Sequence, residues 1–387
     1  MDHYDFLVSE NHHFSFHHKF DAILIAKMLQ SQGMKVGILN LFGEDKEPYI
    51  DGIPVVNLPD GLHAPDDSKV AKVGGNPIIK TYYLLKHAYQ RHVFMKKVCN
   101  AVKDWADQFY CGSYLGYMST GFMNLRKPCY YWGLRSYEMK DFWGHGHPIF
   151  SLNMIYAKWK FMRNPWQRLF VSNEFIKNEF VELGVPVDRM IIREERCIDT
   201  ITDNNTESLS DRFSFLVIGQ LRPDKQIDKT VNAFKKADLK DSQLVMVGKS
   251  WRGYEDTITS AIGEATNIVR ENRYLEYDEF YKYFTQSHFV LFADVPGRSS
   301  ITNGTMMEAF IHHRPIIAPN FNPFAYYINK YNLGILYDPN NEQSYINALK
   351  KAKEEGCEKY MPAINEFLKN ILFDKVSKEL YDAVKLS

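Results

Sequence analysis

Short apolar runs alternate with longer amphipathic stretches along the whole chain, and nearly every position within each run is apolar. Strands that are covered by helices on both faces have this continuous pattern, which is typical of parallel sheets in α/β domains. In the first half of the chain the pattern predicts strands at residues 4–8, 36–41, 53–56, 129–132 and 169–172. It also predicts helices from about residue 20 to 32 and from about residue 78 to 108.

The same pattern starts again after a polar stretch at residues 199–211 (DTITDNNTESLSD), which we interpret as a linker. Five further strands are predicted at residues 213–219, 244–248, 289–292, 315–318 and 334–337, and residues 360–386 are predicted to be helical. We therefore expect an α/β protein with two Rossmann-like, doubly wound domains. The expected domains are residues 1–198 and 212–358, followed by a C-terminal helix at 359–387.

The composition narrows the class of protein. In 387 residues, 47 Lys and Arg balance 47 Asp and Glu, which disfavours a protein whose main partner is a nucleic acid. The five cysteines are an odd number without a CxxC pair, so the sequence predicts neither a disulfide framework nor a zinc site. Residues 1–5 lack the features of a signal peptide, and no apolar run reaches the roughly 20 residues that span a bilayer. We expect a cytoplasmic protein.

Residues 219–225 (GQLRPDK) follow a predicted strand and lead into a helix. Ligands bind at the carboxyl edge of open α/β sheets, where loop N–H groups and helix N-termini attract anions. Arg222 and Lys225 add full positive charges to this loop, which suits a diphosphate. The other interpretation is an ordinary strand–helix turn with two solvated cations.

Residues 299–309 (SSITNGTMMEA) form a second candidate loop after the strand at 289–292. A helix is predicted to begin near Asn303, and the small and polar residues there leave room for phosphates against free backbone N–H groups. Glu308 lies about one turn inside this helix, where it could accept hydrogen bonds from a ribose or sugar hydroxyl. Alternatively, Asn303 is only a helix cap and Glu308 an exposed helix residue.

Together, these segments resemble the C-terminal domain of GT-B glycosyltransferases. The closest likeness is to the nucleotide-sugar-dependent group 1 class (family 4) that builds polysaccharides. The resemblance spans about residues 169–380, and its specific parts are residues 219–225, Val247 and Gly248, and residues 300–318, which end in RPIIA. It implies two Rossmann-like domains that face each other across a cleft, with the final helix crossing back to the first domain.

The resemblance also implies roles for single residues. Lys225 matches the lysine that holds the donor diphosphate, and Gly219 and Arg222 lie in the same motif. Members of the family generally need no metal and no other cofactor, because positively charged groups such as this lysine neutralise the leaving diphosphate. The expected ligand is therefore a nucleoside-diphosphate sugar alone.

The helix after the second loop carries the other implied contacts. Asn303, Gly304 and Thr305 match the helix N-terminus that cradles the phosphates, and Glu308 matches the second glutamate of the family's Glu-x7-Glu motif, which typically holds the ribose. The first glutamate of that motif falls on Ser300, at the position that usually meets the donor sugar. The donor sugar is therefore held differently here, or the motif is aligned in another register.

Other positions also depart from the family's pattern. The arginine that commonly follows the first glycine is Gln220, and Arg222 is its nearest substitute. The Asn-Gly before the linker is replaced by Arg196-Cys197. No Gly-Gly loop follows the first strand, and residues 132–135 (WGLR) lack the histidine often found there, which leaves Arg135 as a catalytic candidate.

Residues 10–18 (ENHHFSFHH) replace the glycine loop and contain four histidines where an acceptor would enter. Because histidine titrates near neutrality, His12 and His13 are candidates for a general base or for sugar contacts. Solvated loop histidines, one of them packed on a phenylalanine, are the alternative, and nothing in the spacing supports a metal site.

Residues 156–168 (YAKWKFMRNPWQR) interleave lysine and arginine with tryptophan and phenylalanine. Such a segment could rest on an anionic membrane surface and serve a lipid-linked acceptor. It could equally be a core-facing helix with a solvated basic side.

The sequence thus predicts a glycosyltransferase that moves a sugar from a nucleoside-diphosphate sugar to a hydroxyl of a glycan or lipid-linked acceptor, without a metal and with retention of configuration. Two alternatives stay open. One is a GT-B sugar-nucleotide epimerase, and the other is a degenerate subunit that binds glycan or nucleotide without catalysis.

Overall fold

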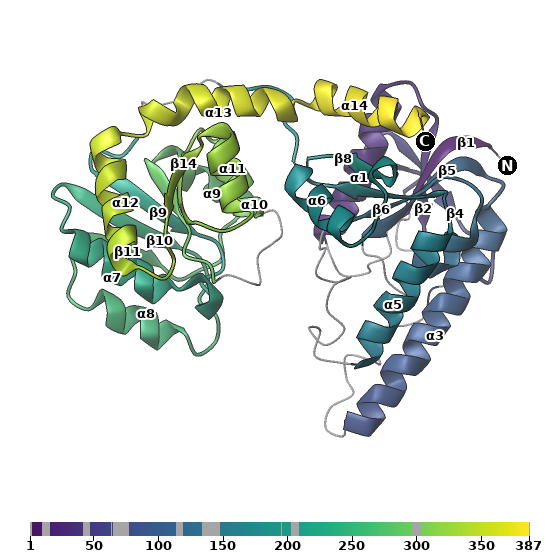
Figure 1. Cartoon of the computed structure of the whole chain (residues 1–387), viewed down its shortest axis with the longest axis horizontal. Helices are drawn as coiled ribbons and strands as arrows, with labels where there is room; N and C mark the ends of the chain where they lie inside the picture. Colours follow the sequence, from purple (N-terminus) through teal and green to yellow (C-terminus); the bar gives the residue numbers. More distant parts are fainter. Residues whose placement is uncertain are drawn as a thin grey trace. The chain divides into compact units, whose positions relative to one another are not determined.

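The computed structural model describes residues 2–9, 16–41, 47–62, 64, 77–113, 119–133, 148–194, 196–202, 209–295 and 303–386. The chain divides into two compact units (Figure 1). The first unit comprises residues 1–195 and 373–387, and the second comprises residues 196–372. Each unit has its own sheet and its own core of buried apolar side chains.

The first unit contains an eight-stranded sheet in the order β3-β4-β2-β1-β5-β6-β7-β8. Its strands are β1 (Tyr4–Ser9), β2 (Val36–Asn40), β3 (Tyr49–Ile50), β4 (Ile53–Asn57), β5 (Ala106–Ser113), β6 (Cys129–Trp132), β7 (Gln167–Val171) and β8 (Met190–Ile192). Neighbouring strands pair in parallel, apart from β3 and β4, which are antiparallel.

The helices of the first unit lie on both sides of its sheet (Figure 1). They are α1 (Phe16–Ser31), α3 (Pro77–Val102), α5 (Pro148–Arg163), α6 (Glu174–Glu182) and α14 (Phe373–Lys385), with 3-10 turns η1 (Ser119–Asn124) and η2 (Val187–Arg189). The last helix packs on α1 although the two are at opposite ends of the sequence. Its residues Val376, Leu380 and Val384 are buried at helical spacing, which explains why this short segment joins the first unit.

The second unit contains a parallel six-stranded sheet in the order β11-β10-β9-β12-β13-β14. Its strands are β9 (Phe213–Ile218), β10 (Ser242–Val247), β11 (Ile268–Glu271), β12 (Phe289–Leu291), β13 (Ile316–Pro319) and β14 (Gly334–Tyr337). The chain runs outward from β9 through β10 to β11 and then returns to the other side of β9 as β12. This change of direction is the topological switch point at which open α/β sheets bind ligands.

Helices also lie on both sides of the second sheet (Figure 1). They are α7 (Ile227–Ala237), α8 (Glu255–Ile262), α9 (Tyr277–Thr285), α10 (Gly304–Ile311), α11 (Phe324–Tyr331), α12 (Glu342–Glu355) and α13 (Met361–Leu368), with 3-10 turns η4 (Pro223–Lys225), η5 (Glu358–Tyr360) and η6 (Lys369–Ile371). In α7, Ile227, Val231 and Phe234 are buried at spacings of four and three residues. This pattern turns one face of the helix to the core and its lysines to solvent.

The structure corrects the helix predicted at residues 78–108. Helix α3 ends at Val102, and residues 106–113 form β5, which pairs with β1 on one side and β6 on the other. Pairing on both sides buries Phe109 and Tyr110 and outweighs the helical preference of the preceding residues.

The C-terminal residues also differ from the single helix predicted at 360–386. Helix α13 ends at Leu368, and Leu372 is extended because its backbone pairs with Ile198 at the start of the second unit. The amide of Ile198 donates to the carbonyl of Ile371 (3.0 Å). The units therefore divide at residues 195/196 and 372/373, whereas the sequence analysis placed a linker at 199–211.

Candidate functional site

The candidate site of the second unit lies at the carboxyl edge of its sheet, between β9 and β12. The chain leaves β9 at Gly219 and leaves β12 toward Asp294. The amide of Val295 donates to the carbonyl of Asp224 (2.9 Å), so the loops after the two strands are joined. These loops contain most of the donor-site residues that the sequence predicts.

Two glycines shape the loops after β9 and β10. Gly219 has φ 102° and Gly248 has φ 140°, values that residues with a side chain rarely adopt. A Cβ on Gly248 would lie 1.9 Å from the carbonyl oxygen of Gly219, so a larger residue would push the two loops apart. The amide of Gly219 also donates to the carbonyl of Val247 (3.0 Å). The Gly219 loop is therefore held closely by its neighbour.

Lys225 and Thr305 meet over the Gly219 loop. The Nζ atom of Lys225 lies 3.6 Å from the position that a Cβ on Gly219 would occupy, and Oγ1 of Thr305 lies 3.8 Å from the same position. A lysine ammonium and a threonine hydroxyl thus border space that the missing Gly219 side chain leaves open. The structure brings these three predicted residues together.

Asp294 is a residue of this site that the sequence analysis missed. It is only 8% exposed, and its charge partly offsets the effect of burial, which lowers the pKa of Lys225. Burial also raises the pKa of Asp294, while Lys225 opposes that rise. An acidic residue directly after the apolar run Phe289–Ala293 was the available signal, because charged side chains are rarely buried without a partner.

The N-terminus of α10 lies beside Lys225 and is capped by Asn303. The side-chain oxygen of Asn303 accepts hydrogen bonds from the amides of Thr305 (3.0 Å) and Met306 (3.3 Å). The cap fixes the start of the helix, so the positive end of its dipole faces the same loop as the Lys225 ammonium. Asn303 therefore has the structural role of a cap, and its neighbours Gly304 and Thr305 form the first turn.

Glu308 lies between Arg196 and His312 on the inner side of α10. Its Oε1 is 3.8 Å from Nε of Arg196, and its Oε2 is 3.9 Å from Nε2 of His312. The side chain is 13% exposed, and burial raises the pKa of Glu308 while Arg196 partly lowers it. Burial lowers the pKa of His312 to about 4, so this imidazole is neutral at neutral pH and only Arg196 offers Glu308 a full charge.

Arg196 is the second site residue that the sequence analysis missed as a ligand. Besides its contact with Glu308, its Nη2 atom lies 3.7 Å from the position that a Cβ on Gly304 would occupy. The guanidinium therefore spans from the ribose candidate to the first residue of α10. The sequence did show Arg196-Cys197 where the family has Asn-Gly. The role of Arg196 could not be predicted from this difference, because it depends on contacts with α10, which is distant in the sequence.

Arg222 does not lie free at the loop. Its Nε and Nη2 donate to the two carboxylate oxygens of Asp224 at 3.1 and 3.0 Å, and its side chain is 41% exposed. A bidentate pair of this kind orients the guanidinium along its own turn. The role of Arg222 at a diphosphate stays a prediction.

Four predicted residues lie outside the described part of the chain. They are His12, His13, Arg135 and Ser300. Their proposed catalytic and sugar-binding roles therefore stay predictions. Among the residues that the structure describes, no three His, Cys, Asp or Glu side chains are gathered as metal ligands would be.

The segment 156–168 begins in a core-facing helix with an exposed aromatic and basic side, and its contact with a membrane stays a prediction. Ala157 and Phe161 of α5 are fully buried in the first unit's core, whereas Trp159 is 50% and Trp166 is 39% exposed. The helix therefore faces the core on one side and presents aromatic and basic side chains on the other. Within the described ranges, no helix is both long and apolar enough to cross a membrane.

Comparisons with known proteins extend these observations. Residues 200–367 match the family described as "Glycosyl transferases group 1". No curated protein sequence is a significant match. Among solved structures, a glycosyltransferase from Rickettsia africae is 15% identical, with a TM-score of 0.66 over 100% of this chain and 99% of its own.

Two further structures have the same fold. Anabaena HepE in complex with UDP is 12% identical, with a TM-score of 0.67 over 100% of both chains. WaaG, a glycosyltransferase involved in lipopolysaccharide biosynthesis, is 13% identical, with a TM-score of 0.58 over 98% of both chains. The whole chain thus has the GT-B fold of two Rossmann-like domains, as the motif resemblance implied. Residues 200–367 match the group 1 glycosyl transferases, and this match together with the fold supports glycosyltransferase activity.

Proposed function

We propose that the protein transfers a sugar from a nucleoside-diphosphate sugar to a hydroxyl of a glycan or lipid-linked acceptor. The observation that carries the proposal is the meeting of Lys225, Thr305 and the N-terminus of α10 over the open position at Gly219. An ammonium, a hydroxyl and a helix dipole that converge on one space are suited to a diphosphate.

In the proposed reaction, the bond between C1 of the sugar and the diphosphate oxygen breaks, and the diphosphate leaves with the electron pair. A bond forms between C1 and the acceptor oxygen, and the acceptor hydroxyl loses its proton. Charge on the leaving diphosphate is stabilised by Lys225, by the α10 dipole and by Arg196, whose Nη2 lies at Gly304. Because these groups supply positive charge, we propose that no metal is required.

Glu308 is proposed to hold the ribose. Its carboxylate is largely buried behind the α10 N-terminus, about one helical turn from Gly304, and in its ionised form accepts hydrogen bonds without donating any. Arg196 partly offsets the rise in the pKa of this carboxylate and lies between it and the phosphate end of the site. A single guanidinium thus connects the proposed ribose and diphosphate contacts.

The relatives of similar fold guide the choice of donor. Anabaena HepE has been solved with UDP and with UDP-glucose, and the trehalose-6-phosphate protein from E. coli with UDP-2-fluoro glucose. We propose a UDP-sugar as the first donor to test and retention of configuration as the outcome. WaaB and WaaG are described as lipopolysaccharide glycosyltransferases, which supports a saccharide acceptor on a lipid. Contact of residues 156–168 with an anionic membrane is part of this proposal.

The test begins with calorimetric titration of UDP-, GDP- and ADP-sugars into the full chain, followed by a product assay. We expect one class of sugar nucleotide to bind, and transfer to proceed in EDTA. Lys225→Ala should lower turnover by at least about 100-fold, since removing a donor that stabilises a developing charge costs roughly 2.7–4 kcal/mol. Lys240→Ala, an exposed lysine of the same unit, is the matched control.

Three results would contradict the proposal. Full activity of Lys225→Ala would remove the diphosphate site assigned here. Loss of transfer in EDTA that Mg²⁺ restores would contradict metal independence. Rearrangement of the sugar nucleotide without any acceptor would indicate an epimerase, and proton NMR of the anomeric centre in the product distinguishes retention from inversion.

A further inference from the structure

Two helices of the first unit contain no acidic residue. Over α3 and α5 the sequence has eight cations and no aspartate or glutamate, although the chain as a whole is neutral. The cations are Lys80, Lys86, Arg91, Lys96, Lys97, Lys158, Lys160 and Arg163. An excess of this kind on two neighbouring helices creates a local positive field, which the neutral total conceals.

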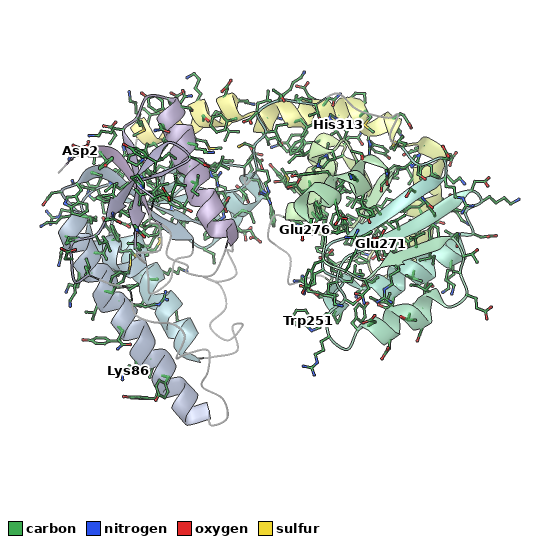
Figure 2. All side chains as sticks on the ribbon, turned by 180° about the vertical axis from the view of Figure 1, so that it is seen from behind. Asp2, Lys86, Trp251, Glu271, Glu276 and His313 are labelled. Carbon is green, nitrogen blue, oxygen red and sulfur yellow. The ribbon has the colours of Figure 1, made fainter. Side chains whose placement is uncertain are left out.

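The two helices run side by side and project together from the first unit's sheet (Figure 1). The His92 ring of α3 contacts the Tyr156 ring of α5, with 6.5 Å between centroids. Figure 2 labels Lys86 on the projecting part of α3. Burial lowers the pKa of His92, and the charges of Lys160 and Lys96 lower it further, as expected in a positive field.

The outer face of α5 combines aromatic and basic side chains. Tyr156, Trp159, Lys160 and Arg163 follow one another at helical spacing, and the opposite face is buried. The guanidinium of Arg163 lies 4.8 Å from the centre of the Trp159 ring, and the ammonium of Lys160 lies 5.3 Å from that of Tyr156. Neither cation forms an ion pair with a carboxylate of a described residue. Their charges are therefore available to an external anion.

Large apolar side chains are exposed around these charges. Ile155 is 49% exposed and Trp159 50%, while on α3 Leu85 is 50% and Tyr89 69% exposed. Exposed aliphatic and aromatic groups are unfavourable in water but suit the interface between lipid headgroups and acyl chains. A soluble anion would account for the cations alone and not for these groups.

A pocket opens where α5 ends. Its volume is about 480 Å³, and its lining includes Arg126, Lys160, Arg163, Trp159 and Trp166. It lies near the residues that precede β6 and β7, at the edge of the sheet opposite the carboxyl ends of its strands. It is therefore separate from the edge at which open α/β sheets bind their substrates.

The floor of this pocket is fixed by hydrogen bonds. The side-chain amide of Asn164 donates to the carbonyls of Met123 and Leu125, both at 2.8 Å, and its oxygen accepts from the amide of Trp166 (3.1 Å). Arg189 donates to the carbonyls of Phe161 (3.1 Å) and Asn164 (3.3 Å) at the end of α5. A site held in this way loses little conformational freedom when a ligand binds.

We propose that the outer face of α5 docks on an anionic phospholipid surface and that the pocket of Arg126, Lys160 and Arg163 holds the phosphate of one headgroup. Trp159 and Trp166 border this pocket and lie at the level of the headgroups, and α3 adds to the positive field. The inference deepens the proposed membrane contact by naming the lipid class and the residues that bind it.

The test is co-sedimentation of the full chain with vesicles of phosphatidylcholine alone or mixed with phosphatidylglycerol, at low salt. We expect sedimentation only with the anionic vesicles and release at high salt, since exposed charges are then screened. Lys160→Glu/Arg163→Glu should weaken partitioning by at least about 30-fold, because each lysine or arginine near an anionic surface strengthens binding about fivefold and two are lost. Lys240→Glu/Lys350→Glu, in the second unit, changes the net charge equally and should bind like the wild type.

Two measurements distinguish binding of a headgroup in the pocket from attraction to a diffuse charged surface. Binding of anionic vesicles should shift tryptophan emission to the blue, and Trp159→Phe/Trp166→Phe should lose that shift while still sedimenting. Glycerol 3-phosphate should compete with the vesicles. Direct binding of glycerol 3-phosphate without any vesicle binding would overturn the proposal in favour of a soluble phosphate ligand, and equal sedimentation of the Lys160/Arg163 and control variants would overturn it altogether.

Donor titrations on the same variants keep this proposal distinct from the proposed function. If sugar-nucleotide affinity is unchanged and vesicle binding is absent, the proposed glycosyl transfer is retained and only the docking proposal is rejected. Absent donor binding together with intact vesicle binding would do the reverse.

Discussion

Nε of Arg196 lies 3.8 Å from Oε1 of Glu308, so the first residue of the second unit contacts the helix that carries the proposed ribose contact. The same guanidinium reaches the start of that helix at Gly304. The chain has glutamine at the position after Gly219 where the family commonly has arginine. Arg196 is therefore a second source of positive charge for the donor, from a different part of the sequence.

Replacing Arg196 should weaken donor binding more than replacing Arg222. Arg196→Ala should weaken sugar-nucleotide binding about 10- to 150-fold, because a hydrogen bond to a charged group contributes about 1.5–3 kcal/mol. Arg222→Ala should cause a smaller loss, since Arg222 is already paired with Asp224. Calorimetric titration of both variants measures the two effects, and the reverse order would return the diphosphate role to Arg222.

Donor affinity should depend on the ionisation of Glu308. Burial raises the pKa of Glu308 above its ordinary value of 4.5, so the carboxylate begins to take up a proton at a higher pH than an exposed glutamate does. The affinity of wild type should fall as the pH drops through this raised pKa, because the protonated group no longer accepts hydrogen bonds at both oxygens. A donor sugar nucleotide serves as the titrant, since its diphosphate diester keeps its charge over this range.

Two variants check the assignment of that pH step. Glu308→Gln should bind the donor weakly at every pH and show no step. In Arg196→Ala the step should move to higher pH, because Arg196 lowers the pKa of Glu308 in the wild type. A step that persists in Glu308→Gln would assign the titration to another group.

Alanine at the two loop glycines should have different consequences. Gly219→Ala should destabilise the fold by only about 1–2 kcal/mol, the usual cost of a side chain in a left-handed conformation, but should reduce donor binding because the new methyl group occupies the space beside Lys225. Gly248→Ala should destabilise it by more than about 3 kcal/mol, because its Cβ collides with the Gly219 backbone. Urea denaturation of the two variants and donor titration of Gly219→Ala test this contrast, which equal stabilities would contradict.

Arg314 is predicted to support stability and not donor binding. It is 1% exposed, and its guanidinium donates to the carbonyls of Phe284 (2.8 Å), Thr285 (2.8 Å) and His313 (3.1 Å). Arg314→Ala should lower the free energy of unfolding by about 2–4 kcal/mol, because buried carbonyls at the end of α9 lose their donors. Arg212→Ala, at an exposed position, should stay within about 0.5 kcal/mol. A large loss of donor affinity in folded Arg314→Ala would contradict the assignment.

Local sequence was sufficient to predict five of the six strands of the second sheet, all except β11, and the start of α10. The apolar runs that lead to Gly219 and Gly248 mark β9 and β10, and β13 is buried throughout, as the continuous pattern indicated. Asn303 caps α10 where the sequence predicted the helix to begin. Hydrophobic period, glycine conformation and capping act within a few residues, so each can be read from a short segment.

The amino-acid sequence by itself thus determined the fold class, the resemblance of residues 200–367 to group 1 glycosyl transferases, and the positions of Gly219, Lys225, Thr305 and Glu308 in their motifs. Only the tertiary structure decided that Arg196 accompanies Glu308, that Asp294 lies near Lys225, and that residues 373–387 join the first unit. The physical reason is that a side chain's partners depend on the path of the chain between distant segments. Charge, size and period limit the partners that a residue accepts, but the packing of strands and helices determines which one is within reach.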